Sequence, residues 1–331
     1  MNSLVKYFPK SKKIPIDKFI FNAMYDKNYG YYSKKIPFGK NGDFITSPGI
    51  SPLFSETIAL WIIAFWEHLE KPKIFNIVEL GPGSGQMCST LVRVFKKFPL
   101  FFKSANIFLY EKSKALEDLQ KKNLNCEKIN WIKNFSKIKK GPVIFFGNEF
   151  FDAIPIKQFK KINNILYEKY VKLENNSKIV TSFKKANLKS IIELKKYNLL
   201  KTNSFIEFPK QGLIELNPII NTIKKLNGGL LLIDYGFLKQ ENKNTLQSVI
   251  NHKKNMIFKN VGNADITALV NFNLLEKYLR KKKLKLNNIV TQEFFLKKMG
   301  IVNRAEIVSQ KMNFKEKSDL YLRLQRLLST T

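Results

Sequence analysis

A glycine-rich segment, Glu79-Leu80-Gly81-Pro82-Gly83-Ser84-Gly85, constrains the fold of this chain more than any other feature. The apolar run 75–80 leads into it and predicts a buried strand, while residues 86–97 behind it predict a helix. Glycines allow positive φ angles and let a ligand approach the backbone closely. The first turn of the helix would direct free amides and the positive end of its dipole at that ligand. The segment therefore predicts an α/β sheet with a nucleotide-like ligand at a strand-to-helix turn.

The spacing of the glycines discriminates between ligands. A dinucleotide fingerprint would place its third glycine at Gln86, and a Walker loop would need Gly-Lys-Ser/Thr. An acid followed by alternating glycines is the usual first motif of methyltransferases that use S-adenosylmethionine. The predicted strand 106–110 ends in Glu111, where a carboxylate would accept hydrogen bonds from both ribose hydroxyls; the alternative is an ordinary neighbour of a helix N-cap. The predicted cofactor is S-adenosylmethionine, bound by Glu79, Gly81, Gly83, Gly85 and Glu111.

Short apolar runs alternate with helical segments from residue 75 onward, which indicates an open α/β sheet. We expect strands at 75–80, 106–110, 143–147 and 230–233, helices at 86–97, 113–122, 214–225 and 273–282, and a terminal antiparallel pair within 285–296. The predicted fold class is the class I, Rossmann-like methyltransferase fold with an N-terminal helical cap and an inserted substrate module. Its predicted segments are a cap and loop at 1–72, a core at 73–155 and 206–300, a substrate-facing insertion at 156–205 and a helical segment at 301–331.

The segment Asn148-Glu149-Phe150-Phe151-Asp152 follows the predicted strand 143–147 and would face the transferable methyl group. Adenine methyltransferases carry Asn/Asp-Pro-Pro-Tyr/Phe here, and this chain has neither proline. A carboxylate suits a cationic acceptor such as a guanidinium. The predicted catalytic residues are Asn148, Glu149 and Asp152, and the predicted substrate-binding residues are Phe150, Glu207, Asp234 and Tyr235. The alternatives are a helix cap for Glu149 and a lysine ion pair for Asp152.

The chemistry is an in-line displacement that depends on positioning and desolvation. Arginine has a high pKa, so a proton must leave during or after attack. Glu149 would localise the guanidinium charge, and Asp152 or Glu207 would accept the proton.

The net charge of +32 raises the possibility of a nucleic-acid partner. The positive charge is nearly all lysine scattered along the chain, whereas nucleic-acid binders commonly add arginine and interleaved aromatics. A solvated surface is the preferred interpretation, so we expect no nucleic-acid partner.

The two cysteines, Cys88 and Cys126, form no zinc-like spacing with His68 and His252, so we expect neither a metal nor a disulfide framework. No apolar run is long enough to cross a bilayer, so we expect no membrane insertion. The N-terminal segment has the pattern of neither a secretory signal nor a mitochondrial presequence. The predicted location is the cytoplasm.

Further motifs occur in order along the chain. They are Tyr29-Gly30-Tyr31-Tyr32, Gly42-Asp43-Phe44-Ile45-Thr46-Ser47-Pro48, Asp234-Tyr235-Gly236, Thr245-Leu246-Gln247, Ala264-Asp265-Ile266-Thr267 and Gly300-Ile301. Together with the glycine loop and the segment from Asn148 to Pro155, they resemble the MidA-like family, relatives of the mitochondrial arginine methyltransferase that assists assembly of respiratory complex I.

The resemblance implies protein arginine methylation, with a complex I subunit as the possible substrate, and it makes Asp43 a further cofactor-binding candidate. Ser84 stands where the family loop usually has Arg, Gly49 where an acid is common, and Thr90 where the first helix carries an acid. The alternatives are an RNA methyltransferase, and a non-catalytic assembly factor that retains the cofactor-binding fold.

Overall fold

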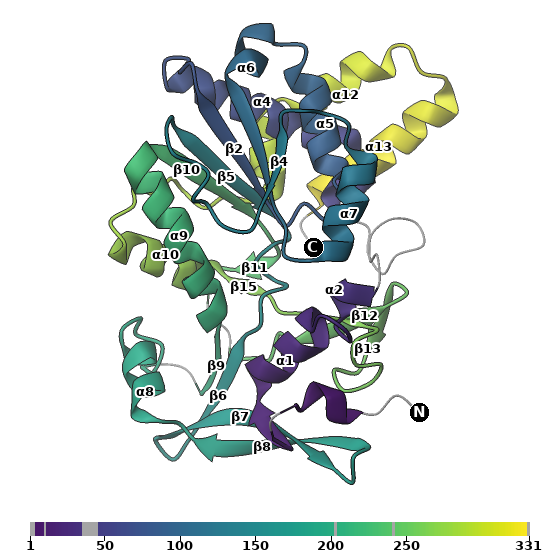
Figure 1. The fold of residues 1–331 in the computed structure, drawn as a ribbon. Helices are drawn as coiled ribbons and strands as arrows, with labels where there is room; N and C mark the ends of the chain where they lie inside the picture. The colour runs from purple at the N-terminus through teal and green to yellow at the C-terminus, as the bar shows by residue number, and fades with distance from the viewer. Residues whose placement is uncertain (1–3, 10, 35–45, 202–203, 240–241, 330–331) are drawn as a thin grey trace. The chain divides into compact units, whose positions relative to one another are not determined.

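The computed structural model describes residues 4–9, 11–34, 46–201, 204–239 and 242–329, and the chain forms two compact units (Figure 1). The parallel-sheet unit comprises residues 38–149, 221–233 and 287–331. The antiparallel unit comprises residues 1–37, 150–220 and 234–286. Within the described residues, no helix combines the length and apolar character needed to cross a membrane.

Five parallel strands form the sheet of the first unit, in the order β10-β5-β2-β3-β4. The strands are β2 (Phe75–Leu80), β3 (Ala105–Tyr110), β4 (Ile129–Ile132), β5 (Val143–Asn148) and β10 (Gly228–Ile233). The strands predicted at 75–80, 106–110, 143–147 and 230–233 are thereby confirmed. The strand order reverses between β2 and β5, and ligands of such sheets lie beyond the carboxyl ends at this reversal.

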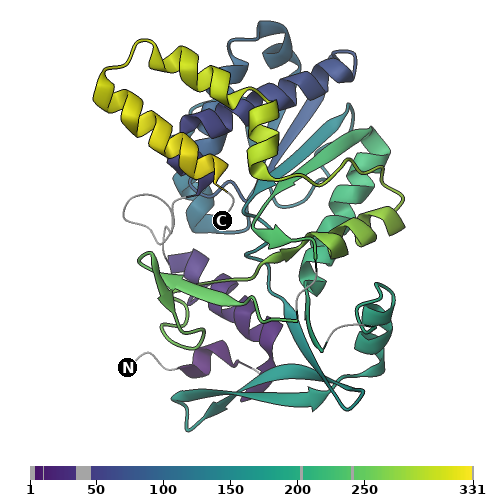
Figure 2. The same ribbon diagram turned by 180° about the vertical axis from the view of Figure 1, so that it is seen from behind.

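The helices of the same unit pack against the sheet and against one another. They are α3 (Ser47–Ile50), α4 (Pro52–His68), α5 (Gln86–Phe95), α6 (Pro99–Ser104), α7 (Lys114–Asn123), α11 (Gln292–Lys298), α12 (Ile301–Ser309) and α13 (Phe314–Leu328). Alternate residues of the strands, such as Ile77, Leu109 and Phe146, share one core with α4, α5 and α13. Figure 2 shows the C-terminal helices, in yellow, beside α4. Glu56 of α4 forms ion pairs with Arg93 of α5 at 3.0 Å and with Arg304 of α12 at 2.9 Å. These ion pairs connect α4 to both helices.

The predicted antiparallel pair at 285–296 is wrong. Among the described residues this segment contains no strand, and α11 begins at Gln292. The Thr291 side chain accepts a hydrogen bond from the amide of Phe294, which caps the helix. Leu296 is completely buried in the core. Capping and core packing therefore outweigh the strand-like alternation of lysines and apolar residues.

The antiparallel unit contains three small sheets. One has the order β1-β7-β6-β9 with β8 paired to β7, the second has the order β13-β12-β14, and the third pairs β11 with β15. Its strands are β1 (Lys13–Pro15), β6 (Lys157–Ile162), β7 (Ile165–Glu174), β8 (Lys178–Lys185), β9 (Phe205–Phe208), β11 (Gly236–Phe237), β12 (Gln247–Ile250), β13 (Lys253–Asn255), β14 (Asp265–Thr267) and β15 (Val270–Asn271).

The helices of this unit are η1 (Leu4–Tyr7), α1 (Ile16–Tyr25), α2 (Tyr31–Lys34), α8 (Leu188–Lys195) and α10 (Phe272–Lys281), and α9 (Lys210–Leu226) begins in it and ends in the other unit. The compact units do not follow the four predicted segments, because α1 and α4 of the predicted cap fall in different units. The functional division into cap, core and insertion stays a prediction.

Candidate functional site

The glycine loop follows β2 and leads into α5. Gly81, Gly83 and Gly85 have φ angles of 63°, 56° and 81°, in the left-handed region that side chains disfavour. A Cβ on Gly85 would lie 3.0 Å from Leu124 Cδ1, so the loop is also crowded there. The amide of Gly81 donates to the carbonyl of Tyr110 at 3.0 Å, which ties the loop to β3. The three glycines therefore meet a conformational need of this turn.

Glu79 lies next to the loop at the end of β2 and is only 5% exposed. Its Oε2 atom is buried and has no hydrogen-bond partner among the described residues. Burial raises the pKa of this carboxyl to about 8, and the nearby charge of Glu111 adds to the effect. Buried polar atoms are almost always hydrogen-bonded, so a lone acceptor at a strand end indicates a ligand donor.

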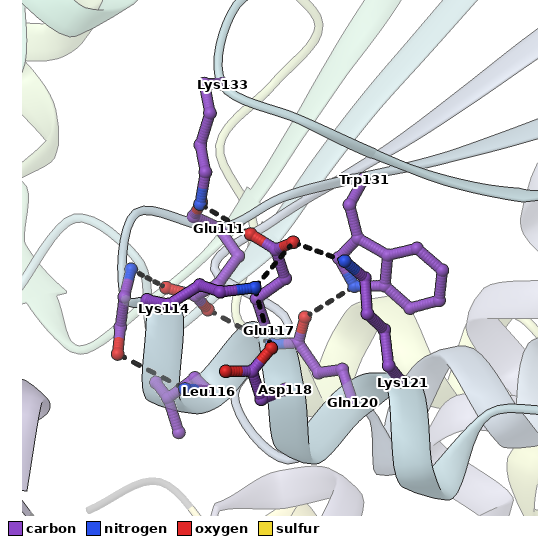
Figure 3. A network of polar contacts seen from close by, with 10 residues as sticks. Glu111, Lys114, Leu116, Glu117, Asp118, Gln120, Lys121, Trp131 and Lys133 are labelled. Atoms are coloured by element: carbon purple, nitrogen blue, oxygen red, sulfur yellow. Dashed lines mark hydrogen bonds and ion pairs between the residues drawn. The ribbon is translucent and has the colours of Figure 1, made fainter.

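Glu111 ends β3, as predicted, and it is also buried. Its Oε1 atom accepts the amide of Ser113 at 2.8 Å, and its Oε2 atom accepts Gln120 Nε2 at 3.2 Å (Figure 3). Burial raises its pKa, and these hydrogen bonds oppose the rise. The carboxylate is held in one orientation while lone pairs remain for a diol.

Gln120 is a residue that the sequence analysis missed. Its Nε2 atom donates both to Glu111 and to the carbonyl of Gly83, the latter at 2.8 Å. Its Oε1 atom accepts the indole N–H of Trp131 at 3.0 Å, which fixes the orientation of the amide. The side chain is completely buried. One sequence signal existed: Leu116, Gln120 and Leu124 recur every four residues, so a glutamine occupies an inward position of α7.

A network of lysines around Glu117 lies next to this bridge (Figure 3). Glu117 accepts hydrogen bonds from Lys121 at 2.6 Å and Lys133 at 2.8 Å, which lower its pKa to about 2. Lys133 also donates to the carbonyl of Glu111 at 2.6 Å. The network thus connects α7 to the end of β3 and supports the position of Glu111.

Asn148 and Glu149 lie at the end of β5. Glu149 has a φ angle of 50°, which is strained for a residue with a side chain. Its amide donates to the carbonyl of Ile233 at 2.8 Å. Its Oε1 atom accepts Asn148 Nδ2 at 3.1 Å and the amide of Ser47 at 3.3 Å. Burial raises its pKa, opposed by these two hydrogen bonds.

Asn148 Oδ1 is buried and, like Glu79 Oε2, has no hydrogen-bond partner among the described residues. Glu149 acts in part as a helix cap, which was the alternative interpretation. It accepts the amide of Ser47, the first residue of the short α3. A cap does not require the positive φ angle or the buried acceptor beside it. Strain of this kind is concentrated at functional sites.

The remaining predicted residues that the structure describes lie in the antiparallel unit. The chain passes from one unit to the other between Glu149 and Phe150, and again between Ile233 and Asp234. Asp234 Oδ2 accepts the amides of Phe151 at 2.8 Å and Asp152 at 3.2 Å, and its Oδ1 accepts the amide of Tyr235. Asp234 therefore organises the turn that carries Asp152.

Glu207 is held by hydrogen bonds within its own unit. Its carboxylate accepts the Thr245 amide at 3.1 Å, the Thr245 hydroxyl at 2.5 Å and Gln158 Nε2 at 2.7 Å. Phe150 is half-buried and Tyr235 is exposed. Asp43 lies outside the described residues.

Asp152 belongs to a cluster of residues from several sequence motifs. The motifs did not predict that these residues lie close together. The Tyr32 hydroxyl donates to Asp265 Oδ1 at 3.5 Å. Burial and the charges of Asp265 and Asp152 raise the pKa of Tyr32 well above its usual value. The Tyr25 ring lies 5.3 Å from that of Tyr32. Two motifs without an assigned role, around Tyr32 and around Asp265, thus meet beside Asp152.

Comparison with known proteins identifies the family. Residues 57–290 match the family model described as "Putative S-adenosyl-L-methionine-dependent methyltransferase". The chain belongs to this family. It is therefore a methyltransferase that uses S-adenosylmethionine, and the predicted cofactor and enzyme class are confirmed.

Three curated relatives show the extent of the similarity, and each is named a mitochondrial protein arginine methyltransferase, NDUFAF7 or its homolog. The Caenorhabditis elegans protein is 31% identical over 83% of this chain and 70% of its own. The Homo sapiens protein is 28% identical over 91% and 73%, and the Xenopus laevis protein is 27% identical over 95% and 77%.

Two crystal structures from Burkholderia thailandensis share the fold. One, a "likely methyl transferase" bound to S-adenosyl-homocysteine, superposes with a TM-score of 0.78 at 20% identity, covering 96% of this chain and 84% of that one. A native structure from the same superfamily gives 0.79 at 19% identity, covering 96% and 83%. The predicted class I methyltransferase fold is confirmed.

The predicted cytoplasmic location is wrong by the same comparison, because the relatives are all named mitochondrial. The prediction relied on unpaired cysteines and on the absence of a recognisable targeting pattern. Neither property distinguishes one reducing compartment from another, since location is decided by receptor-read signals and not by the folded domain.

Proposed function

We propose that this methyltransferase modifies arginine side chains of a protein substrate. The observation that carries the proposal is the pair of acceptors at the end of β5, the strained Glu149 carboxylate and the buried, unpartnered Asn148 Oδ1. A guanidinium offers five N–H donors in a rigid plane and matches two neighbouring acceptors. A hydroxyl, which has a single donor, would leave one of these acceptors without a partner.

The residues of the parallel-sheet unit have proposed roles in binding S-adenosylmethionine. The three glycines let the ligand approach the backbone, and Glu111, oriented by Gln120, accepts hydrogen bonds from the ribose hydroxyls. Glu79 Oε2 has no hydrogen-bond partner among the described residues, and we assign it to accepting a hydrogen bond from the ligand. A loop shaped by left-handed glycines and two buried carboxylates fits this cofactor, which supplies a methyl group on a sulfonium.

For the transfer, we assign Glu149 to holding the guanidinium so that one nitrogen faces the methyl carbon. The nitrogen–carbon bond forms as the carbon–sulfur bond breaks, and one proton leaves the nitrogen. Glu149, whose pKa is raised by burial, or Asp152 accepts this proton. Because Glu207 already has three donors in its own unit, we assign it to positioning Thr245.

The cluster around Asp152 supports a cationic acceptor. Asp152 and Asp265 supply negative charge, and Tyr25 and Tyr32 supply aromatic rings. Carboxylates and aromatic faces are the two chemical groups that bind guanidinium side chains best. We propose that this cluster contributes to recognition of the target arginine.

The names of the relatives support a protein substrate and arginine as the acceptor. A complex I subunit is the substrate that the family resemblance implies, and we retain it as a proposal. Three of the five arginines of the chain, Arg93, Arg280 and Arg304, are paired with carboxylates, which reduces the positive charge they offer to phosphates. We therefore favour a protein over an RNA substrate.

The decisive experiment is incubation of cell extract with methyl-labelled S-adenosylmethionine and the purified enzyme, followed by mass spectrometry of the labelled products. We expect methylarginine in a protein, and no label above background with the Glu149→Gln variant. Label in RNA, or on lysine, would overturn the proposal.

A further inference from the structure

A groove of about 880 Å³ lies wholly within the antiparallel unit. Strands β8, β12 and β13 line it together with the segments that flank them. Apolar side chains such as Leu246, Met256 and Phe258 contribute to its surface, and Met256 is 75% exposed. The groove therefore combines strand edges with an accessible apolar surface.

Four lysines line the same groove, Lys169, Lys178, Lys254 and Lys259, and no acid is among the lining residues. The ion pairs found among the described residues of this unit involve Lys157, Lys172, Lys210 and Arg280, and none of the groove lysines. Lys169 is half-buried, and burial lowers its pKa, opposed in part by the charge of Glu207. The groove therefore presents positive charge that the described residues leave without an ion pair.

Partly buried hydrogen bonds hold one wall of the groove in place. Glu207 accepts both the amide and the hydroxyl of Thr245, and Gln158 donates to Asn244 at 2.6 Å. Gln158 is completely buried and also accepts the Lys169 ammonium at 2.8 Å. The wall is thus preorganised, which lowers the entropic cost of binding a partner.

We propose that this groove docks an extended acidic segment of the protein that accepts the methyl group, an inference that rests on the proposed protein substrate. Carboxylates would pair with the lysines, and alternate apolar side chains would cover Leu246 and Met256. Among the described strands, β8 pairs only with β7 and β13 only with β12, so each leaves an edge for strand addition. RNA fits less well, because no arginine and only one aromatic residue, Phe258, line the groove.

Fluorescence anisotropy with the full-length enzyme tests the docking directly. The ligand is a labelled peptide in which Asp and Glu alternate with Leu and Phe. Charge reversal of the three exposed lysines, Lys178→Glu, Lys254→Glu and Lys259→Glu together, is expected to weaken binding about tenfold or more. A control with two charge reversals, Lys97→Glu and Lys139→Glu on exposed positions of the parallel-sheet unit, should change the affinity less than about twofold.

Circular dichroism and cofactor binding confirm that each variant is folded. Equal weakening by the control pair, or no peptide binding by the wild type, overturns the docking. Displacement of the peptide by single-stranded RNA whose own affinity depends on the three lysines overturns the choice of partner. Arginine labelling in extract without peptide binding overturns only the docking, whereas peptide binding without arginine labelling overturns the proposed function.

Discussion

Two groups of carboxylates, one in each unit, differ in the hydrogen bonds that hold them. In the parallel-sheet unit, Glu79 keeps a buried oxygen without a partner, and burial raises the pKa values of Glu79, Glu111 and Glu149. In the antiparallel unit, Glu207 and Asp234 each accept at least three hydrogen bonds from their own unit. The first group retains capacity for a ligand, while the second stabilises loops. An acid at a strand end is therefore a stronger binding candidate when one of its oxygens is left without a partner, as in Glu79.

The largest effect is expected for Gly83→Val. A β-branched side chain at a φ angle of 56° is strained, and the loop must shift from its ligand-binding conformation. We expect cofactor affinity to fall about a hundredfold or more, measured by isothermal titration calorimetry. Unchanged affinity would show that the loop is not part of the cofactor site, and circular dichroism excludes global unfolding.

Glu149→Gln separates the two groups of carboxylates by their effect on turnover. Loss of the negative charge should lower methyl transfer about a hundredfold, while cofactor affinity stays within about twofold. The control is Glu207→Gln, which should lower the free energy of unfolding by about 1 kcal/mol and leave turnover within about threefold. Equal turnover losses in the two variants would contradict the distinction between them.

Gln120→Met tests the bridge between the glycine loop and Glu111. Methionine keeps the volume of the side chain but removes both hydrogen bonds of the Nε2 atom. We expect cofactor affinity to fall about tenfold, corresponding to about 1.4 kcal/mol. Trp131→Phe removes the donor to Gln120 Oε1 together with part of the ring, leaves the Nε2 hydrogen bonds in place, and should have a smaller effect in the same direction. An unchanged affinity in both variants would show that Gln120 contributes to core packing and not to cofactor binding.

The last prediction concerns stability and not affinity or turnover: a pH dependence caused by Glu79. Its pKa is about 8 in the folded protein and near 4.5 in the unfolded chain, so the folded state binds more protons between these values. The contribution of Glu79 to stability is therefore present below about pH 4.5 and is lost as the pH rises through about 8. Denaturant unfolding of the ligand-free protein should show this loss, and Glu79→Gln should remove it. The same pH profile in both proteins would assign the loss to other groups.

Much of the fold was predictable because its determinants are local. The apolar runs before Gly81 and before Glu111 are short, buried on both faces and followed by turn residues, and they form β2 and β3 as expected. The terminal segment was not predictable in this way. Its alternating pattern favours a strand, but the cap at Thr291 and the burial of Leu296 make it a helix.

The candidate site also has features that local sequence determines and features that depend on distant contacts. The sequence by itself determined the glycine turn, the acids at the ends of three strands and the methyltransferase family, because each depends on residue type at a fixed spacing. Only the tertiary structure decided which hydrogen-bond donors those acids and their neighbours meet. Gln120 meets Gly83 across 37 positions, Glu207 meets Thr245 across 38 and Asp234 meets Phe151 across 83. Whether a carboxylate is free to bind a ligand depends on such distant donors, and no local pattern encodes them.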